Sequence, residues 1–119
     1  MSDVKILVFD DDLVHHPSFF DGLRATFRFR GDGREALEEV QGWDPDLVLM
    51  DYSMGSGPSG AEATASIRSA FPLGSLPILG ISTSGPCNQE MLRRGADDAV
   101  LKHLAYDWVR DWLRDSPTS

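Results

Sequence analysis

The 119-residue chain has little of three things, namely cysteine, positive charge and long apolar runs. The single cysteine, Cys87, excludes an internal disulfide framework. No apolar run reaches membrane-spanning length or is typical of a secretion signal. Lys and Arg number 11 against 19 Asp and Glu, and the net charge of −8 disfavours nucleic acid or an anionic membrane as the main partner. We expect a cytoplasmic protein that binds a cation or a basic protein surface.

Length and composition predict one compact domain. Apolar residues make up 41% of the chain and charged residues 25%, which allows a single hydrophobic core. We expect residues 1–115 to form this domain, and residues 116–119 to form a frayed tail or the start of a linker. The sequence contains neither an internal repeat nor a low-complexity tract.

Short apolar runs bounded by Gly, Pro, Asp or Ser predict strands. The five runs are Val4–Phe9, Thr26–Arg30, Leu47–Met50, Ile78–Ile81 and Ala99–Leu101. The first, third and fourth runs are apolar without alternation, which is typical of parallel strands covered by helices on both faces. In the second run, Phe27 and Phe29 alternate with Arg28 and Arg30, so we expect an edge strand with one polar face.

Segments with helical spacing separate these runs. Asp32 is a candidate N-cap for a helix with Ala36, Leu37 and Val40 on one face. Further helices are expected over Gly60–Phe71, closed by Pro72, and over Ala105–Arg114. Their apolar faces carry Ala63, Ile67, Ala70 and Phe71 in the first, and Ala105, Val109, Trp112 and Leu113 in the second. The alternation of strands and helices predicts right-handed βαβ units in a doubly wound α/β sheet.

Polar side chains follow the predicted strands at their carboxyl ends, where doubly wound sheets place their sites. They are Asp10, Asp11 and Asp12 after the first strand, Asp51 after the third, Ser82 and Thr83 after the fourth, and Lys102 after the fifth. Carboxylates in one cleft repel one another unless a cation lies among them, so the cluster predicts a divalent metal, and oxygen ligands favour Mg²⁺ or Mn²⁺. A lysine and a hydroxyl can hold phosphoryl oxygens, and an aspartate beside a metal can accept a phosphoryl group as an acyl phosphate. Taken singly, each aspartate could instead be a turn former or an N-cap.

Four segments carry a resemblance to a known family. Residues 6–12 read Ile-Leu-Val-Phe-Asp-Asp-Asp, and residues 45–54 read Pro-Asp-Leu-Val-Leu-Met-Asp-Tyr-Ser-Met. Residues 77–83 end in Ser-Thr, and residues 95–102 end in Leu-Lys. Through these segments the chain resembles, over essentially its whole length, the response-regulator receiver domains of two-component signalling. The resemblance implies a flavodoxin-like five-stranded parallel sheet in the order 2-1-3-4-5, with helices on both faces.

The resemblance also implies a phosphoacceptor and a metal site. Asp51 would take a phosphoryl group from a phosphohistidine on a sensor histidine kinase or a phosphotransfer protein. Asp11, Asp51 and the backbone carbonyl of Ser53 would bind Mg²⁺ or Mn²⁺, and Asp10 would act mostly through a bound water. The domain would promote its own phosphorylation and dephosphorylation without turning over a separate substrate.

By the same resemblance, Ser82 would bond a phosphoryl oxygen and Lys102 would pair with the phosphate. Phosphorylation would draw their loops inward and present a different face of the last helices to a downstream protein partner. Direct contact with nucleic acid or a membrane is not expected.

The chain departs from the family pattern in four places. The loop Gly55–Gly60 is one residue longer than usual and lacks the usual proline after the methionine. The segment around Pro17 is about four residues short, so we expect a truncated first helix. Ala99 stands where many members carry an aromatic residue that turns inward on activation. His103 replaces the usual proline after Lys102, so we expect a trans peptide bond there.

Several other residues have simpler interpretations. His15 and His16 follow the acidic cluster and could bind a metal, but we interpret them as solvated loop residues. Tyr106 and Trp108 lie at the edges of the last helix's apolar face, where packing is favoured over a partner contact. Cys87 has no CxxC spacing and is interpreted as a bystander.

Two alternative functions remain open from the sequence. One is a receiver-like docking module that phosphorylation does not control. The other is a phosphatase of the haloacid-dehalogenase type, with Asp10 as nucleophile, Asp12 as general acid and base, and Ser82 and Lys102 as phosphate-binding groups. Such enzymes need an acidic pair after the lysine, and the phosphatase hypothesis leaves Asp51 without a role.

Overall fold

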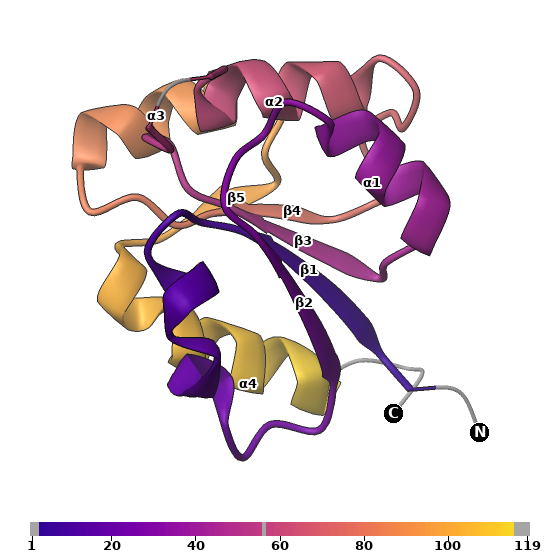
Figure 1. Ribbon diagram of the computed structural model, residues 1–119, viewed down its shortest axis with the longest axis vertical. Coiled ribbons are helices and arrows are strands. Elements are labelled where there is room, and N and C mark those ends of the chain that lie inside the picture. Colours follow the sequence, from indigo (N-terminus) through magenta and orange to yellow (C-terminus); the bar gives the residue numbers. More distant parts are fainter. Residues whose placement is uncertain (1–2, 56, 116–119) are drawn as a thin grey trace.

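The computed structural model describes residues 3–55 and 57–115, so the expected tail at residues 116–119 lies outside the described part. Five parallel strands form one sheet in the order β2-β1-β3-β4-β5, which confirms the predicted topology (Figure 1). The strands are β1 (Lys5–Phe9), β2 (Thr26–Arg30), β3 (Leu47–Met50), β4 (Ile78–Gly80) and β5 (Asp98–Ala99). The run expected at Ala99–Leu101 is corrected: the strand begins one residue earlier and is shorter, although Val100 N still donates to Gly80 O at 2.9 Å.

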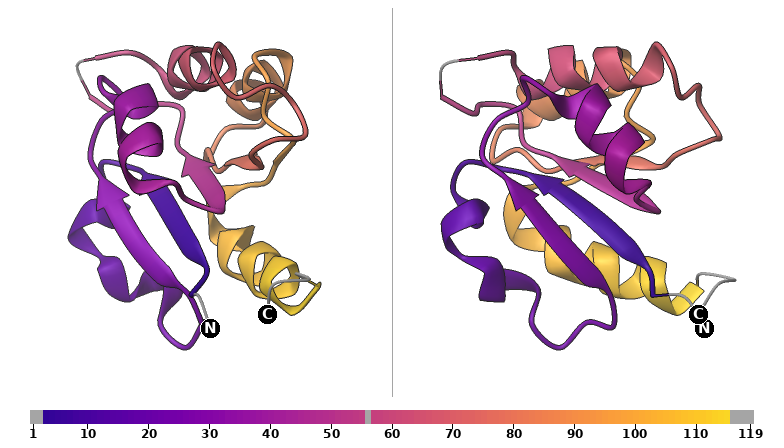
Figure 2. Two further views of the ribbon diagram at one scale, coloured as in Figure 1. Left: turned by 90° about the vertical axis from the view of Figure 1, so that its right-hand side faces the viewer. Right: turned by 45° about the vertical axis from the view of Figure 1, so that its right-hand side comes forward.

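Helices cover both faces of the sheet (Figures 1 and 2). Over one face lie α1 (Ala36–Trp43), α2 (Gly60–Arg68) and α3 (Gly85–Arg93). Over the other lie α4 (Ala105–Asp115) and two 3₁₀ helices, η1 (Leu13–His15) and η2 (Pro17–Phe20), while a third, η3 (Lys102–Leu104), leads into α4. Side chains of the central strands alternate between two apolar cores, so every residue of β3 is buried.

The segment between β1 and β2 confirms the truncated first helix. Only η1 and η2 form there, and Pro17 is the first residue of η2, where its missing N–H leaves no carbonyl unpaired. Phe20 of η2 is 2% exposed and stacks on Phe27 of β2, with ring centroids 4.8 Å apart. A compact aromatic cluster therefore covers the part of the sheet that a longer helix would cover.

β2 is an edge strand with one polar face, as the alternation of Phe and Arg predicts. Phe27 and Phe29 pack against the core beneath the sheet. On the opposite face, the Arg28 guanidinium lies over the ring of Trp43, 4.6 Å from its centroid.

The expected start of α1 at Asp32 is wrong. Asp32 Oδ1 accepts a hydrogen bond from Arg34 N at 3.0 Å, and the helix begins only after Glu35. Aspartate forms such local turns as readily as helix caps, because its short side chain reaches the backbone two residues on. Of the predicted inner face, Ala36 and Val40 are buried and Leu37 is half-buried.

The expected end of α2 at Phe71 is also wrong, because the helix ends at Arg68. After the helix the chain forms a tighter turn, in which the N–H groups of Ala70 and Phe71 both donate to Ile67 O. Ala70, expected on the apolar face of this helix, is exposed. Pro72 disfavours helical geometry in the residue before it, which accounts for the early exit.

The last helix agrees with its prediction. Ala105 and Val109 of α4 are buried, and the polar face forms ion pairs such as Arg110 with Asp107 at 3.2 Å. Among residues 3–55 and 57–115, no helix is long and apolar enough to cross a membrane.

Candidate functional site

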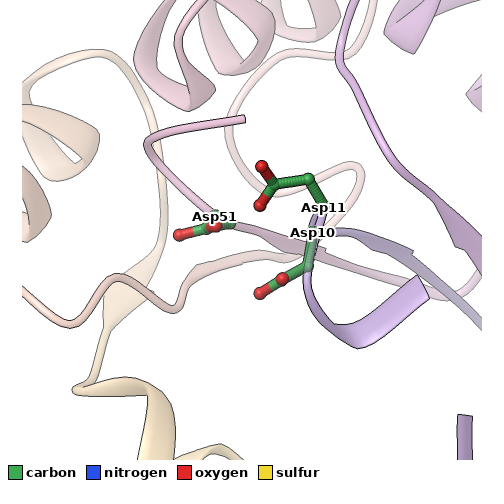
Figure 3. Close-up of side chains that lie close together, drawn as sticks. All are labelled: Asp10, Asp11 and Asp51. Atoms are coloured by element: carbon green, nitrogen blue, oxygen red, sulfur yellow. The ribbon is translucent and has the colours of Figure 1, made fainter. Parts of the chain in front are cut away.

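The carboxyl ends of β1 and β3 bring three aspartates together. Phe9 of β1 is in register with Met50 of β3, so the residues that follow them lie side by side at one edge of the sheet. Figure 3 shows Asp10, Asp11 and Asp51 at this edge, and one carboxylate oxygen of each lies within 4.8 Å of the other two. Asp10 is fully buried and Asp51 is 6% exposed, whereas Asp11 is exposed to solvent.

Backbone donors hold the buried carboxylate of Asp10. Its Oδ1 accepts hydrogen bonds from the N–H groups of Asp12 and Leu13, at 2.8 and 2.9 Å, where the chain turns into η1. Asp12 follows in sequence but lies outside the three-carboxylate group: its side chain is 63% exposed and faces His16 at 3.7 Å. The site is therefore built from Asp10 and Asp11, not from all three consecutive aspartates.

Lys102, which follows the edge strand β5, also reaches this group. Its Nζ lies 2.8 Å from Asp10 Oδ2 and 3.6 Å from Asp51 Oδ2. Burial by itself would lower the pKa of Lys102, but its bond to Asp10 and the charge of Asp51 outweigh this and raise the pKa above its usual value. The ammonium group of Lys102 is directed at both carboxylates.

The carboxyl group of Asp51 has a pKa raised from 3.8 to about 6. Burial is the largest cause and the charge of Asp10 the next, while Lys102 and a hydrogen bond from Tyr52 N at 2.9 Å oppose them and Asp11 adds a smaller rise. One lysine does not neutralise three carboxylates. A divalent cation with a preference for oxygen ligands fits this group by charge and by donor chemistry.

Ser82 lies at the end of the neighbouring strand. Ile81 N donates to Met50 O at 3.0 Å, which holds the residues that follow, Ser82 and Asp51, at the same end of the two neighbouring strands. Ser82 is 5% exposed, and its Oγ accepts a hydrogen bond from Ser84 N at 3.1 Å. Its hydroxyl proton is thus available to donate to another group. Thr83 is exposed.

Gly60 is a part of the site that the sequence identified only by its unusual spacing. Its N–H donates to Tyr52 O at 2.7 Å, and a Cβ at this position would overlap the backbone carbonyl oxygen of Asp51. The first turn of α2 therefore packs directly on the strand end that carries Asp51, which only glycine allows. Ser53 is exposed in the intervening loop, two residues after Asp51.

Comparison with known proteins now decides the family. Residues 6–114 match the family model of the response regulator receiver domain. This chain belongs to that family. The oxygen regulatory protein NreC of Staphylococcus aureus (strain JH9) is 32% identical over 105 residues, a match that covers 84% of this chain and 48% of NreC. This receiver domain therefore spans about half the length of the curated relatives it matches.

Solved structures agree with the fold of the receiver domain. Chemotaxis protein CheY4 of Vibrio cholerae is 26% identical, with a TM-score of 0.72 over 95% of this chain and 98% of that chain. A LuxR-family two-component response regulator from Aurantimonas sp. SI85-9A1 is 22% identical, with a TM-score of 0.76 over 95% of this chain and 86% of the other, and shows likeness of fold alone. Receiver domains are signalling modules rather than conventional enzymes, and the phosphatase and docking-module alternatives are not favoured.

The structure also decides several secondary interpretations of the receiver domain. His15 and His16 are exposed and outside the carboxylate group. The bond between Lys102 and His103 is trans, as predicted. Trp108 packs at the edge of the core and donates its Nε1–H to Asp98 Oδ2 at 2.9 Å, which confirms the packing interpretation.

Proposed function

We propose that this receiver domain accepts a phosphoryl group on Asp51 and, once phosphorylated, changes the protein surface it presents to a partner. The observation that carries the proposal is the placing of Asp51: a nearly buried carboxylate with two other carboxylates within 4.8 Å and the Lys102 ammonium at 3.6 Å. Carboxylates repel one another, so a domain that did not accept a phosphoryl group would have no physical reason to hold three of them so close.

Transfer requires Asp51 as a carboxylate. One of its oxygens forms the new bond to phosphorus, while the bond from phosphorus to the imidazole nitrogen of a phosphohistidine donor breaks. The nitrogen keeps that electron pair and takes up a proton, and Asp51 becomes an acyl phosphate. The Ser82 hydroxyl donates a hydrogen bond to one phosphoryl oxygen, and the Lys102 ammonium forms an ion pair with another.

Asp10, Asp11, Asp51 and the backbone carbonyl of Ser53 would hold Mg²⁺ or Mn²⁺, with Asp10 acting mostly through a bound water. The cation would supply charge neutralisation for the phosphoryl oxygens. Calorimetric titration with Mg²⁺ tests this ligand set. Asp11→Ala should abolish binding, and His16→Ala, a matched change of an exposed neighbour, should leave it nearly unchanged.

The phosphoryl donor is a sensor histidine kinase or a phosphotransfer protein, and the downstream partner binds the face formed by η3 and α4. A cytoplasmic location belongs to the same proposal. Because Lys102 pairs with the phosphate and begins η3, the state of Asp51 is transmitted to this face.

Intact-mass measurement after incubation with acetyl phosphate and Mg²⁺ tests the phosphoacceptor. Wild type should gain one phosphoryl group, Asp51→Asn none, and Asp12→Asn, a control outside the carboxylate group, one. Peptide mapping that places the phosphoryl group on Asp10 would support the phosphatase alternative. A wild-type protein that takes up no phosphoryl group from any donor would support the docking module.

A further inference from the structure

One buried amide connects the two strand ends that carry Ser82 and Lys102. Asn88 lies on α3 and is 5% exposed. Its Oδ1 accepts a hydrogen bond from Ser82 N at 3.1 Å, and its Nδ2 donates to Val100 O at 3.0 Å, with a longer contact to Ser82 O at 3.4 Å. Resting on the function proposed above, we propose that Asn88 is a positioning residue, which holds the Ser82 turn and the Lys102 loop as one unit around the phosphoryl group.

The sheet itself does not provide this connection. The register of β4 and β5 has two pairs, ending at Gly80 and Ala99, and beyond them, toward the carboxyl ends, a backbone bond runs from Val100 N to Gly80 O. Ser82 and Lys102 both lie beyond that last rung. Asn88 spans the gap with a planar amide, whose acceptor and donor are fixed relative to each other.

A buried amide at this position has a stability cost unless its polar atoms are paired, and a leucine would fill similar space without that cost. The side-chain hydrogen bonds of Asn88 described above all go to the main chain of the two strand ends. The amide therefore fixes backbone positions, independently of which side chains extend from them.

The same network includes the start of α3. Ser84 donates its N–H to Ser82 Oγ at 3.1 Å and caps the helix by accepting from Cys87 N at 3.4 Å. A displacement of the Ser82 hydroxyl toward a phosphoryl oxygen thus moves the first turn of α3, and Asn88 with it. Through Val100 O, that displacement reaches the loop of Lys102.

Asn88→Asp is the sharpest test, because it removes one half of the connection. In Asn88→Asp, one carboxylate oxygen still accepts a hydrogen bond from Ser82 N. The other replaces the N–H group that donates to Val100 O, so this oxygen and Val100 O repel each other. Gln89→Glu is the matched control, since it makes the same change from amide to acid one residue along α3, at an exposed position. Asn88→Ala provides a second, uncharged variant if Asn88→Asp does not fold.

The probes are Mg²⁺ alone, and beryllofluoride with Mg²⁺ as a noncovalent mimic of the phosphoryl group. We expect Asn88→Asp and Asn88→Ala to bind beryllofluoride about tenfold more weakly, in line with the loss of one buried hydrogen bond, and to bind Mg²⁺ within about twofold of wild type. Gln89→Glu should match wild type with both probes.

Two results overturn the inference in different ways. If both Asn88 variants bind beryllofluoride as wild type does, or if Mg²⁺ binding falls by the same factor, the residue has no positioning role toward the phosphoryl group. If wild type itself does not bind beryllofluoride, the proposed function fails and the inference fails with it.

Discussion

Asp51→Asn should stabilise the folded protein at neutral pH when divalent cations are removed. The folded environment raises the pKa of Asp51 from 3.8 to about 6, mainly through burial and then through the charge of Asp10. Between these two pH values the folded state binds more protons than the unfolded state, so the stability of wild type falls as the pH rises through this range. Above about pH 6 the full cost of the charged side chain is present, and asparagine removes it.

The magnitude follows from the raised pKa. At 1.36 kcal/mol for each pKa unit, a rise from 3.8 to about 6 corresponds to roughly 3 kcal/mol. Solvent reaches the site at the exposed Asp11 and screens part of this interaction, which leaves about 1–2 kcal/mol. Asparagine can keep the hydrogen bond from Tyr52 N but loses the attraction of Lys102, an effect already included in the raised pKa.

The assay is urea denaturation with EDTA, carried out from pH 4 to pH 7.5 on wild type, Asp51→Asn and the control Asp21→Asn. Asp21 is an exposed aspartate outside the carboxylate group, so its variant should differ from wild type by less than about 0.5 kcal/mol. The advantage of Asp51→Asn should be largest at pH 7.5 and nearly absent at pH 4.

Adding Mg²⁺ at pH 7.5 should shrink the advantage of Asp51→Asn, because the cation binds and stabilises the ionised wild-type site. The reasoning is refuted if Asp51→Asn is equal to or less stable than wild type at pH 7.5 in EDTA. It is also refuted if the difference grows as the pH falls.

Three further substitutions test the packing around the site and beneath it. Gly60→Ala should lower the unfolding free energy by about 1–3 kcal/mol in urea denaturation and slow phosphoryl uptake, because the new Cβ would overlap the Asp51 carbonyl. The control Gly42→Ala, in open space on α1, should raise the unfolding free energy by about 0.5–1 kcal/mol. Equal stability of the two variants would contradict this. Arg68→Lys should lower the unfolding free energy by about 2–3 kcal/mol, since its guanidinium bonds several backbone carbonyls and Asp97 at once, and an unchanged urea midpoint would exclude that role. Thr64→Val should be neutral or stabilising by up to about 1 kcal/mol, because the buried Thr64 hydroxyl has no hydrogen-bond partner within the described residues; a clear loss would reveal one.

The strand ends could be predicted from the sequence because main-chain geometry alone brings them together. Asp10 and Asp51 each follow a continuous apolar run, and parallel pairing then places both at one edge of the sheet. Lys102 was identified in the same way, as the charged residue after the last run. That it contacts Asp10 more closely than Asp51 depends on side-chain reach, which the pattern does not contain.

Helix limits were less predictable because local side-chain bonds compete for the same backbone groups. Asp32 forms a turn with Arg34 where a cap was expected. The helix α3 shows almost no apolar stripe, since only Asn88 and Met91 are buried along it. A single asparagine among polar neighbours is indistinguishable in sequence from a solvated one, so its connecting role could be found only from the contacts.

The departure at Ala99 is best understood together with Asn88. A switch based on an inward-turning ring needs an aromatic side chain at position 99 and space for it to move, and Ala99 has no ring. A buried amide needs neither, because it acts by keeping backbone groups of two strand ends at a fixed separation. Since Asn88 bonds the main chain of Val100, next to Ala99, its effect does not depend on the residue at position 99. On the role proposed for Asn88, the Ser82 and Lys102 ends are coupled by hydrogen bonds to the main chain, which require no aromatic residue at position 99.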